Sequence, residues 1–393
     1  MPGAAEHTPW SELVTLSADQ EAFLGLVRTF AAREVRPIAR EVDDADTAVP
    51  WELWRKAAAA GITGFMLPEG LGGGGVTDVL TQAMVQEELC VGDIGLGNLL
   101  TSGGFFAGPV LALGTPEQQA HWLRPLAGLD PPLTAVAVTE PDAGSDVASL
   151  RTRATRTSGG YLLSGSKTWI SNGGVADRYV VFATLSPGSG YRGVTAFLVE
   201  RGVEGLSFGP PLPKLGQRAI VSCPVFLDDV FVPDEQRLGE EGQGFSGLMR
   251  TFDTSRVVLA AAATGLARAA LDYAVAYARD RVQFGKPILE HQAVAFRLAD
   301  AATRIDASRL LVLRAAQALD TGRPASAAAA MAKLYASETA MWVTWAAIQT
   351  LGGWGYSREH LVEKWFRDAK LEEIEEGTSD IQRLVISRHL GKR

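Results

Sequence analysis

The chain has 393 residues, of which 47% are apolar and 21% charged, and its formal net charge at pH 7 is −8. This composition is typical of a soluble globular protein of about two or three domains, and the negative charge disfavours a broad nucleic-acid surface, which needs a basic patch. Because there are only two cysteines, Cys90 and Cys223, and no histidine pair at ligand spacing, we expect neither a disulfide framework nor a metal site.

No targeting or membrane-spanning segment is expected. The first residues, MPGAAEHTPWSELV, lack a basic start followed by an apolar run, so they do not resemble a signal peptide. The most apolar segment, RVVLAAAATGLARAALDYAVAYARDR, is interrupted by Arg268, Asp272 and Arg279, which argues against a membrane span. The sequence therefore predicts a cytoplasmic protein.

Residues 1–133 are predicted to form a helical N-terminal domain. Ser17 is a capping residue before SADQEAFLGLVRTFAAREVRPIAREVDD, whose apolar residues recur at helical intervals. Further helices are expected at WELWRKAAAAG, from Thr77 or Asp78 to about Val91, near SGGFFAGPVLALG, and at TPEQQAHWLRPLAGL, which has Pro116 in its first turn.

Residues 134–240 change character and are predicted to form an antiparallel β-barrel or sandwich. RTRATRTSGGYLLSGSKTW alternates in polarity and turns at Gly159–Gly160, which indicates a hairpin. RYVVFATL, GVTAFLVE and CPVFLDDVFVP are rich in the residues that favour strands. No helix is expected between these strands, so a parallel sheet is disfavoured.

Residues 241–393 return to helix and are predicted to form a four-helix bundle. Long helices are expected from Phe245 to about Val282, from His291 to Leu319 and from Pro324 to Gly352–Gly353, and a shorter one begins near Thr378 or Ser379. The pattern G-x-G-x-x-G occurs in GQGFSG, but no strand follows its helix, so we interpret it as a hinge rather than a dinucleotide site. The fold class is thus mainly α with a central β domain.

Four segments carry residues suited to a large aromatic cofactor with a diphosphate. AVTEPDAGSDVAS presents hydroxyls and backbone N–H groups, and KTWISNGG places Trp169 and Ser171 on one face of a strand. RDRVQFGKP sets Arg281 close to Phe284, and QTLGGWGYSREHLVEKWFRDAK ends a helix at a glycine pair. Each segment alone also has an ordinary structural interpretation, as a turn, a core tryptophan or a helix end.

An acidic run, LEEIEEGTSDIQRL, lies near the C-terminus. Such runs are usually solvated surface. Glu375 and Glu376, however, directly precede Gly377, where the backbone turns easily and another group can approach. From these residues alone, a solvated face and a catalytic base both remain open.

The sequence resembles the acyl-CoA dehydrogenase family of FAD-dependent flavoproteins over nearly its whole length. AVTEPDAGSD and QTLGGWGYSREHLVEKWFRD are similar to the family's two signatures, and WISNGG, RVQFGKPI, EHQAVAFRLAD and EEGTSDIQRL match further segments in the expected order. The resemblance implies a homotetramer that binds FAD between the middle domain and the bundle. It also implies an acyl-CoA thioester substrate and electron-transferring flavoprotein, or a similar carrier, as electron acceptor.

The resemblance assigns a role to individual residues. Those implied to bind FAD within the subunit are Thr139, Ser145, Trp169, Ser171, Thr378 and Asp380. Those implied to reach a neighbour's FAD are Arg281, Phe284, Gln349 and Gly353. Those implied to contact the thioester or its CoA portion are Ser145, Asp253, Arg256 and Gly377.

The family likeness also selects the base. In most members it is the glutamate before the Gly of EGTS, here Glu376, which would remove the α-proton while the β-hydrogen leaves as hydride to flavin N5. Some members carry the base just before the arginine matched by Arg256, but this chain has Ser255 there. Glu375 stands where Tyr is common. It would raise the pKa of Glu376 by like-charge repulsion, or else point to solvent or pair with an arginine.

Other functions on the same scaffold stay open at this level. They are an acyl-carrier-protein thioester dehydrogenase, a flavin oxidase or monooxygenase, and a flavin-free binding protein. Retention of Glu376 argues against the monooxygenase, since oxygen insertion needs no α-proton base. The sequence does not predict the acyl chain length or its branching.

Overall fold

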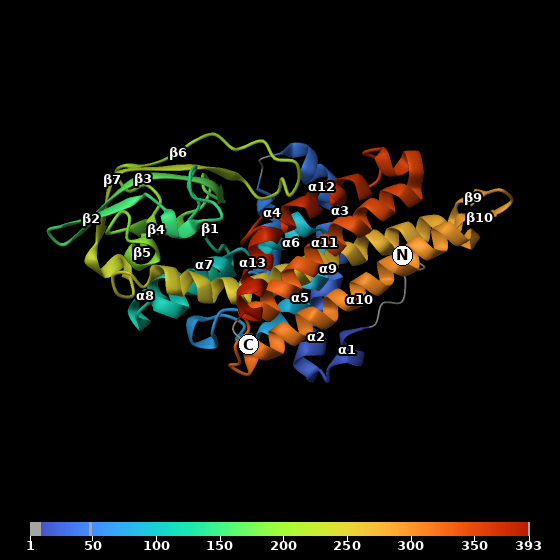
Figure 1. Cartoon of the computed structure of the whole chain (residues 1–393), viewed down its shortest axis with the longest axis horizontal. Helices are drawn as coiled ribbons and strands as arrows, with labels where there is room; N and C mark the ends of the chain where they lie inside the picture. The colour runs from blue at the N-terminus through green and yellow to red at the C-terminus, as the bar shows by residue number, and fades with distance from the viewer. Residues whose placement is uncertain (1–8, 47–48, 392–393) are drawn as a thin grey trace.

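The computed structural model describes residues 9–46 and 49–391 and shows a β domain at one end of an elongated helical body (Figure 1). The N-terminal region contributes helices only, and its last ones, α7 and α8, lie beside the β domain (Figure 1). Its helices are α1 (Trp10–Leu13), α2 (Ala18–Phe30), α3 (Arg36–Ala45), α4 (Trp51–Ala59), α5 (Val79–Gly92), α6 (Ile94–Leu100), α7 (Gly103–Leu113) and α8 (Pro116–Leu123).

Two of these helices, α2 and α5, begin at capping residues that the sequence predicted. Ser17 forms a capping box with Gln20, and Asp78, rather than Thr77, accepts a hydrogen bond from the Thr81 N–H at the start of α5. The first predicted helix is not uniform, because a π-helical turn, Ala31–Val35, separates α2 from α3. Pro37 follows this turn and lacks an N–H, so it interrupts regular α-helical bonding there.

The β domain is a sheet in the order β6-β7-β3-β2-β4-β5-β8, with β1 paired to β4. The predicted hairpin is present, because β2 and β3 pair antiparallel and turn at Gly159, whose φ is +76°. The sheet is mainly antiparallel, but β1 and β2 each pair with β4 in parallel. Its strands are β1 (Thr134–Ala137), β2 (Arg153–Thr157), β3 (Gly160–Ser171), β4 (Arg178–Thr184), β5 (Val194–Glu200), β6 (Leu206–Phe208), β7 (Ser222–Pro233) and β8 (Arg237–Leu238).

The C-terminal region forms the expected helical bundle, with one helix more than the sequence pattern indicated. Its helices are α9 (Gly244–Asp280), α10 (Gln292–Asp320), α11 (Ser326–Leu351), α12 (Val362–Glu372) and α13 (Ser379–Leu390). Between α9 and α10 a small hairpin, β9 (Val282–Gln283) and β10 (Lys286–Pro287), projects from the end of the bundle far from the β domain (Figure 1). Thr378 caps α13 by accepting from the Ile381 N–H, as expected.

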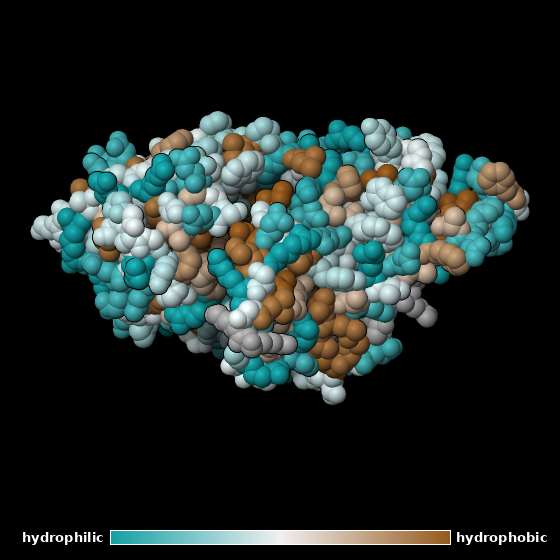
Figure 2. Space-filling model, viewed as in Figure 1, coloured by the Kyte–Doolittle hydropathy of each residue, from teal (hydrophilic) through white to brown (hydrophobic). Residues whose placement is uncertain are grey.

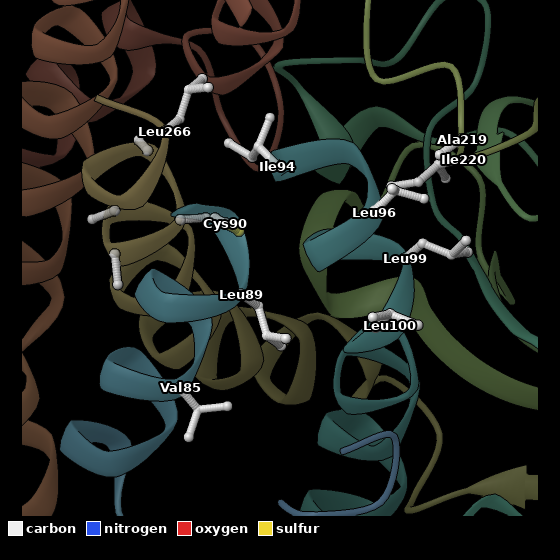
Figure 3. Close-up of a cluster of buried hydrophobic side chains, with 14 of the residues drawn as sticks. Val85, Leu89, Cys90, Ile94, Leu96, Leu99, Leu100, Ala219, Ile220 and Leu266 are labelled. Atoms are coloured by element: carbon white, nitrogen blue, oxygen red, sulfur yellow. The ribbon is translucent and has the colours of Figure 1, made fainter. Parts of the chain in front are cut away.

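One large apolar core joins the N-terminal helices to the bundle. Figure 3 shows part of it, where Cys90 of α5 lies on the side of that helix that faces α9 and Leu266. In the same view Leu96 of α6 lies close to Ala219 and Ile220, which belong to the segment between β6 and β7. Burying a leucine side chain contributes about 1.5–3 kcal/mol, so this contact holds the segment against the helical body.

Among the described residues, two helical segments are long and apolar enough to cross a membrane by length and composition alone, a test that core helices also pass. They are Ile94–Leu113, which holds α6 and α7, and α9 itself. In α9, 72% of the most apolar window is buried inside the protein. The corresponding window of Ile94–Leu113 is 50% buried, and both segments contribute residues to the apolar core of this fold. Apolar surface also gathers in the middle of one face, over the junction of the β domain and the helical body (Figure 2).

Candidate active site

The turn between α12 and α13 places Glu376 in an unusual backbone conformation. Glu376 has φ +50° and Gly377 has φ +98°, so two consecutive residues lie in left-handed space. For glutamate this conformation costs roughly 1–2 kcal/mol, and such strain is typical of functional sites. The Ser379 N–H donates to the Glu373 carbonyl at 3.0 Å and closes the turn. We call Glu373–Thr378 the base turn.

Side chains from α9, α11 and α13 hold the base turn in place. The Ser255 hydroxyl of α9 donates to Glu376 Oε2, and Arg256 Nε donates to the Glu376 carbonyl at 3.2 Å. The Gly377 carbonyl accepts from Lys333 Nζ of α11 at 3.0 Å and from Gln382 Nε2 of α13 at 2.8 Å. The carboxyl group of Glu376 is thus directed at α9 by contacts on both its side chain and its backbone.

This environment makes Glu376 a stronger base than an ordinary glutamate. Burial raises its pKa to about 7; the hydrogen bond from Ser255 opposes that rise, and the nearby Glu375 adds to it. The like-charge effect inferred from the sequence is therefore present, but burial is the larger cause. A carboxylate with a pKa near the working pH is suited to general-base catalysis.

Two predicted substrate-binding residues, Asp253 and Arg256, lie one turn apart on α9 beside the base turn. Arg256 is buried over the Phe252 ring, with its guanidinium 3.7 Å from Asp253 Oδ1. Asp253 Oδ2 also accepts from Ser326 Oγ at 2.5 Å. Arg256 therefore supports the base turn directly, a contact that sequence reasoning did not anticipate.

Three predicted cofactor residues gather on an open face of the β domain. Trp169 sits in a β-bulge of β3 with φ +58°, and its side chain is 58% exposed. Ser171 is exposed on the same face, two residues further on. The Thr168 N–H donates to the Thr139 carbonyl at 2.9 Å, which brings Thr139 beside Trp169. A flat apolar surface and two hydroxyl residues thus lie together.

A buried ion pair that the sequence analysis missed anchors the loop of Thr139 and Ser145. Lys167 Nζ lies 2.7 Å from Glu140 Oε1 and 3.0 Å from the Val138 carbonyl. Glu140 also accepts from the backbone N–H groups of Arg151 and Thr152. Burial lowers the pKa of Lys167 to about 8, and Glu140 opposes this. The sequence did carry a signal for this pair, because Lys167 occupies an inward position of a strand whose residues alternate in polarity.

The remaining cofactor residues lie in two other places. Arg281 and Gly353 line one cavity of about 630 Å³ at the far end of the bundle, and Gln349 is exposed on the last turn of α11. Phe284, in the nearby β9–β10 hairpin, is 95% exposed with φ +53°. Thr378 and Asp380 lie instead at the base turn and the start of α13. Ser145 is exposed on its loop.

The chemistry of these groups fits a flavin dinucleotide. An exposed indole flanked by hydroxyls suits the edge and face of a polar ring system. The Arg281 guanidinium beside the glycine turn at Gly353 suits a diphosphate. The turn is open, because no atom lies within 4 Å of the position that a Cβ atom on Gly353 would occupy. Within the described residues, no group of three or more His, Cys, Asp or Glu side chains is placed to hold a metal ion.

The fold and the site together suit a flavin-dependent enzyme, and comparison with known proteins identifies the family. The N-terminal, middle and C-terminal domain models of acyl-CoA dehydrogenases match residues 17–130, 135–230 and 242–391. The chain therefore belongs to the acyl-CoA dehydrogenase family of FAD-dependent oxidoreductases. The positions of the domain boundaries themselves stay a prediction.

Similar proteins extend over almost the whole chain. Cyclohex-1-ene-1-carbonyl-CoA dehydrogenase of Geobacter metallireducens is 43% identical and covers 95% of this chain and 98% of its own length. The solved structure of butyryl-CoA dehydrogenase from Megasphaera elsdenii is 40% identical, with a TM-score of 0.92 over 96% of this chain and 99% of that one.

Two further solved structures are similar to this chain. One is the prolyl acyl carrier protein oxidase AnaB, at 32% identity and a TM-score of 0.92 over 96% of this chain and 100% of that one. The other is described as an electron-transferring flavoprotein of Acidaminococcus fermentans, at 39% identity and a TM-score of 0.93 over 96% of this chain and 99% of that one.

Proposed function

We propose that this acyl-CoA dehydrogenase introduces a 2,3 double bond into an acyl thioester, with Glu376 as the base. The observation that carries the proposal is the Glu376 carboxyl itself, held by Ser255 in a strained turn with its pKa raised to about 7. A thioester α-proton is weakly acidic, so its removal needs a strong carboxylate base in a site sheltered from water.

The roles of the chain's residues follow from this chemistry. Glu376 accepts the α-proton, and its backbone N–H is proposed to donate to the thioester carbonyl, where negative charge develops. Gly377, Asp253 and Arg256 are proposed to bind the thioester and the CoA portion, and Ser145 to touch the ligand. Bound FAD supplies the acceptor for the β-hydride.

FAD is proposed to lie between the β domain and the bundle. Thr139 and Ser171 would hydrogen-bond its ring, Trp169 would lie against the ring, and Thr378 and Asp380 would contact it from the bundle. We propose that the far end of the bundle serves a neighbouring subunit's FAD, in a homotetramer. The residues proposed for that role are Arg281, Phe284, Gln349 and Gly353.

A short acyl chain carried by CoA is the substrate we propose. Relatives named short-chain specific acyl-CoA dehydrogenase and butyryl-CoA dehydrogenase support this. The similarity to a prolyl acyl carrier protein oxidase supports a second candidate, a carrier-bound thioester. The two candidate substrates are separated by comparing the turnover of butyryl-CoA with that of a butyryl group attached to a carrier protein. A carrier-specific enzyme would leave the free CoA thioester unchanged.

The electron acceptor and the compartment are also proposals. We propose electron-transferring flavoprotein, or a similar carrier, as the acceptor, supported by the similarity to a structure described by that name. We propose a cytoplasmic location, because the free cysteines Cys90 and Cys223 are both buried and suit a reducing compartment.

Replacing Glu376 by Gln tests the central assignment. We expect the substrate-driven loss of flavin absorbance in Glu376→Gln to be about 10²–10⁴-fold slower than in the unaltered holoenzyme. Glu373→Gln is the matched control, because it removes a carboxylate from the same run whose one ion-pair partner among the described residues is the exposed Lys370. Bleaching of Glu376→Gln at the normal rate would overturn the proposal.

A further inference from the structure

The short 3₁₀ turn Gly352–Tyr356, which follows α11, carries a tryptophan at the far end of the bundle. Trp354 lines the cavity of about 630 Å³ together with Arg281 and Gly353, and it is 48% exposed. An indole is a large flat apolar surface, so an exposed indole at the wall of a cavity suits contact with another planar ring. The role proposed for this cavity so far uses Arg281 and Gly353 but not Trp354.

The backbone around Trp354 is pressed against the end of α11. A Cβ atom on Gly355 would lie 2.4 Å from the carbonyl oxygen of Ile348, so only glycine allows the turn to approach the helix this closely. The Ser357 N–H also donates to the Trp354 carbonyl at 3.2 Å. The position of the tryptophan in the cavity wall is therefore fixed by the packing of the turn.

His360 supports the indole from behind. The rings of Trp354 and His360 meet edge to face, with their centroids 5.9 Å apart and an interplanar angle of 68°. The Tyr273 hydroxyl of α9 lies 2.7 Å from His360 Nδ1, and Arg40 Nη2 of α3 donates to the His360 carbonyl at 2.9 Å. Contacts with two other helices thus hold the imidazole ring against which the indole rests.

The rest of the cavity suits an adenosine diphosphate group. Among the described residues that line it, Arg281 is the only charged one, so no carboxylate is present to repel a phosphate. An adenosine diphosphate joins an aromatic base to two phosphates, and an indole beside a guanidinium offers a stacking surface for the base and a charged donor for the phosphates. The cavity volume also lies within the usual range of small-molecule sites, about 300–1,000 Å³.

Two participants in the proposed reaction, FAD and CoA, contain an adenosine diphosphate group. The CoA portion is proposed to bind at Asp253 and Arg256, near the start of α9. Arg281 follows the last residue of that helix, and at 1.5 Å per residue the two arginines are roughly 35–40 Å apart. CoA bound beside the base turn is therefore distant from Trp354, and the geometry favours FAD as the occupant of the cavity.

We propose that Trp354 stacks on the adenine ring of the FAD that serves a neighbouring subunit. His360 is then a positioning residue, because it acts on the cofactor only through the indole that it holds in place. The inference rests on the proposed function and its shared FAD site, and it adds the residue that recognises the adenine end of the cofactor.

The test is the affinity for FAD, measured as flavin fluorescence released when the holoenzyme is diluted. We expect Trp354→Ala to weaken FAD binding about 5- to 150-fold, the range found for a base stacked on an aromatic side chain. Trp354→Phe keeps a ring and should lose less. Trp51→Ala is the matched control, because it removes a 39% exposed tryptophan at the start of α4 that does not line the cavity. Equal release from Trp354→Ala and this control would overturn the proposal.

A second measurement distinguishes FAD from CoA as the source of the adenine ring. The KM for an acyl-CoA thioester is determined for Trp354→Ala and for the unaltered enzyme, both with FAD in excess. If FAD is the occupant, the two KM values should agree. A higher KM in Trp354→Ala, with FAD release unchanged, would place CoA in the cavity and overturn the proposal.

A double variant tests the positioning role of His360. His360→Ala alone should increase FAD release, whereas adding it to Trp354→Ala should cause no further increase, because the indole through which it acts is already absent. Losses of affinity that multiply in the double variant would overturn this role. Failure of the proposed function would appear separately, as normal flavin bleaching in Glu376→Gln.

Discussion

At the scale of single residues, Ser255 is the partner that adjusts the base. Its hydroxyl donates to Glu376 Oε2 and stabilises the ionised carboxylate, which lowers the pKa of Glu376 against the opposing effect of burial. As the proposed base, Glu376 would accept a proton only when ionised, so we expect activity to be lost as the pH falls through its pKa. We expect Ser255→Ala to move the acidic limb of kcat/KM to higher pH and to reduce activity several-fold near pH 7.

Ser246→Ala is the matched control for this prediction. Ser246 lies on the same helix, and its exposed hydroxyl donates to the Gln243 carbonyl rather than to an acid. Its pH profile should match that of the unaltered enzyme. If the acidic limb of the kcat/KM profile of Ser255→Ala stays in place or moves to lower pH, the Ser255 hydroxyl does not stabilise the ionised base.

The sequence selected Glu376 as the proposed base, but it did not predict how the acids of the run differ. The glycine after Glu376 and the family likeness were sufficient to select it. Burial of Glu372 depends on how α12 packs against the segment of Gln217, which is distant in the chain. No local pattern encodes that contact.

At the scale of elements, the loop between β1 and β2 depends on one buried ion pair. Glu140→Gln would leave Lys167 without a carboxylate partner in a site where its side chain is fully buried. Breaking a buried pair from one side costs about 3–5 kcal/mol. We expect a lower melting temperature and weaker FAD binding, because this loop carries Thr139 and Ser145.

Two further variants make that result specific. Asp142→Asn removes the pair with Arg151, in which both side chains are more than 70% exposed, and should change stability by less than about 1 kcal/mol. Adding Lys167→Met to Glu140→Gln removes the buried unpaired charge and should restore most of the lost stability. Equal melting temperatures for Glu140→Gln and the unaltered protein would contradict the predicted role of the pair.

Element boundaries were predictable where capping residues and hydrophobic periodicity agreed, as at Ser17 and Thr378. Departures from regular geometry were not. Alternation placed Trp169 and Ser171 on one face correctly, yet the bulge that gives Trp169 a positive φ arises from the pairing of β3 with β7. The parallel pairing of β1 with β4 likewise depends on the path of the whole sheet, because nothing within either strand specifies its direction.

At the scale of the molecule, the proposed cofactor residues are divided between two distant regions of one chain. Trp169 lies on the β domain, whereas Arg281 and Gly353 line a cavity at the opposite end of the bundle (Figure 1). We therefore expect one FAD to contact only one of these two regions within a chain. The order of domains and their helical or β character followed from sequence patterns, but this separation required the lengths and directions of the helices.

The separation predicts complementation between two defective chains. The Arg281→Ala chain should bind FAD weakly and therefore be inactive when FAD is limiting. The Glu376→Gln chain lacks the proposed base. If each site combines Glu376 of one chain with Arg281 of another, unfolding both variants together and refolding them as a mixture builds some sites with both residues intact. If the two variants pair at random across a symmetric interface, about a quarter of the sites receive both intact residues, so about a quarter of the normal activity per site should return. Each variant refolded alone is the control, and a mixture no more active than these controls would show that every site is built within one chain.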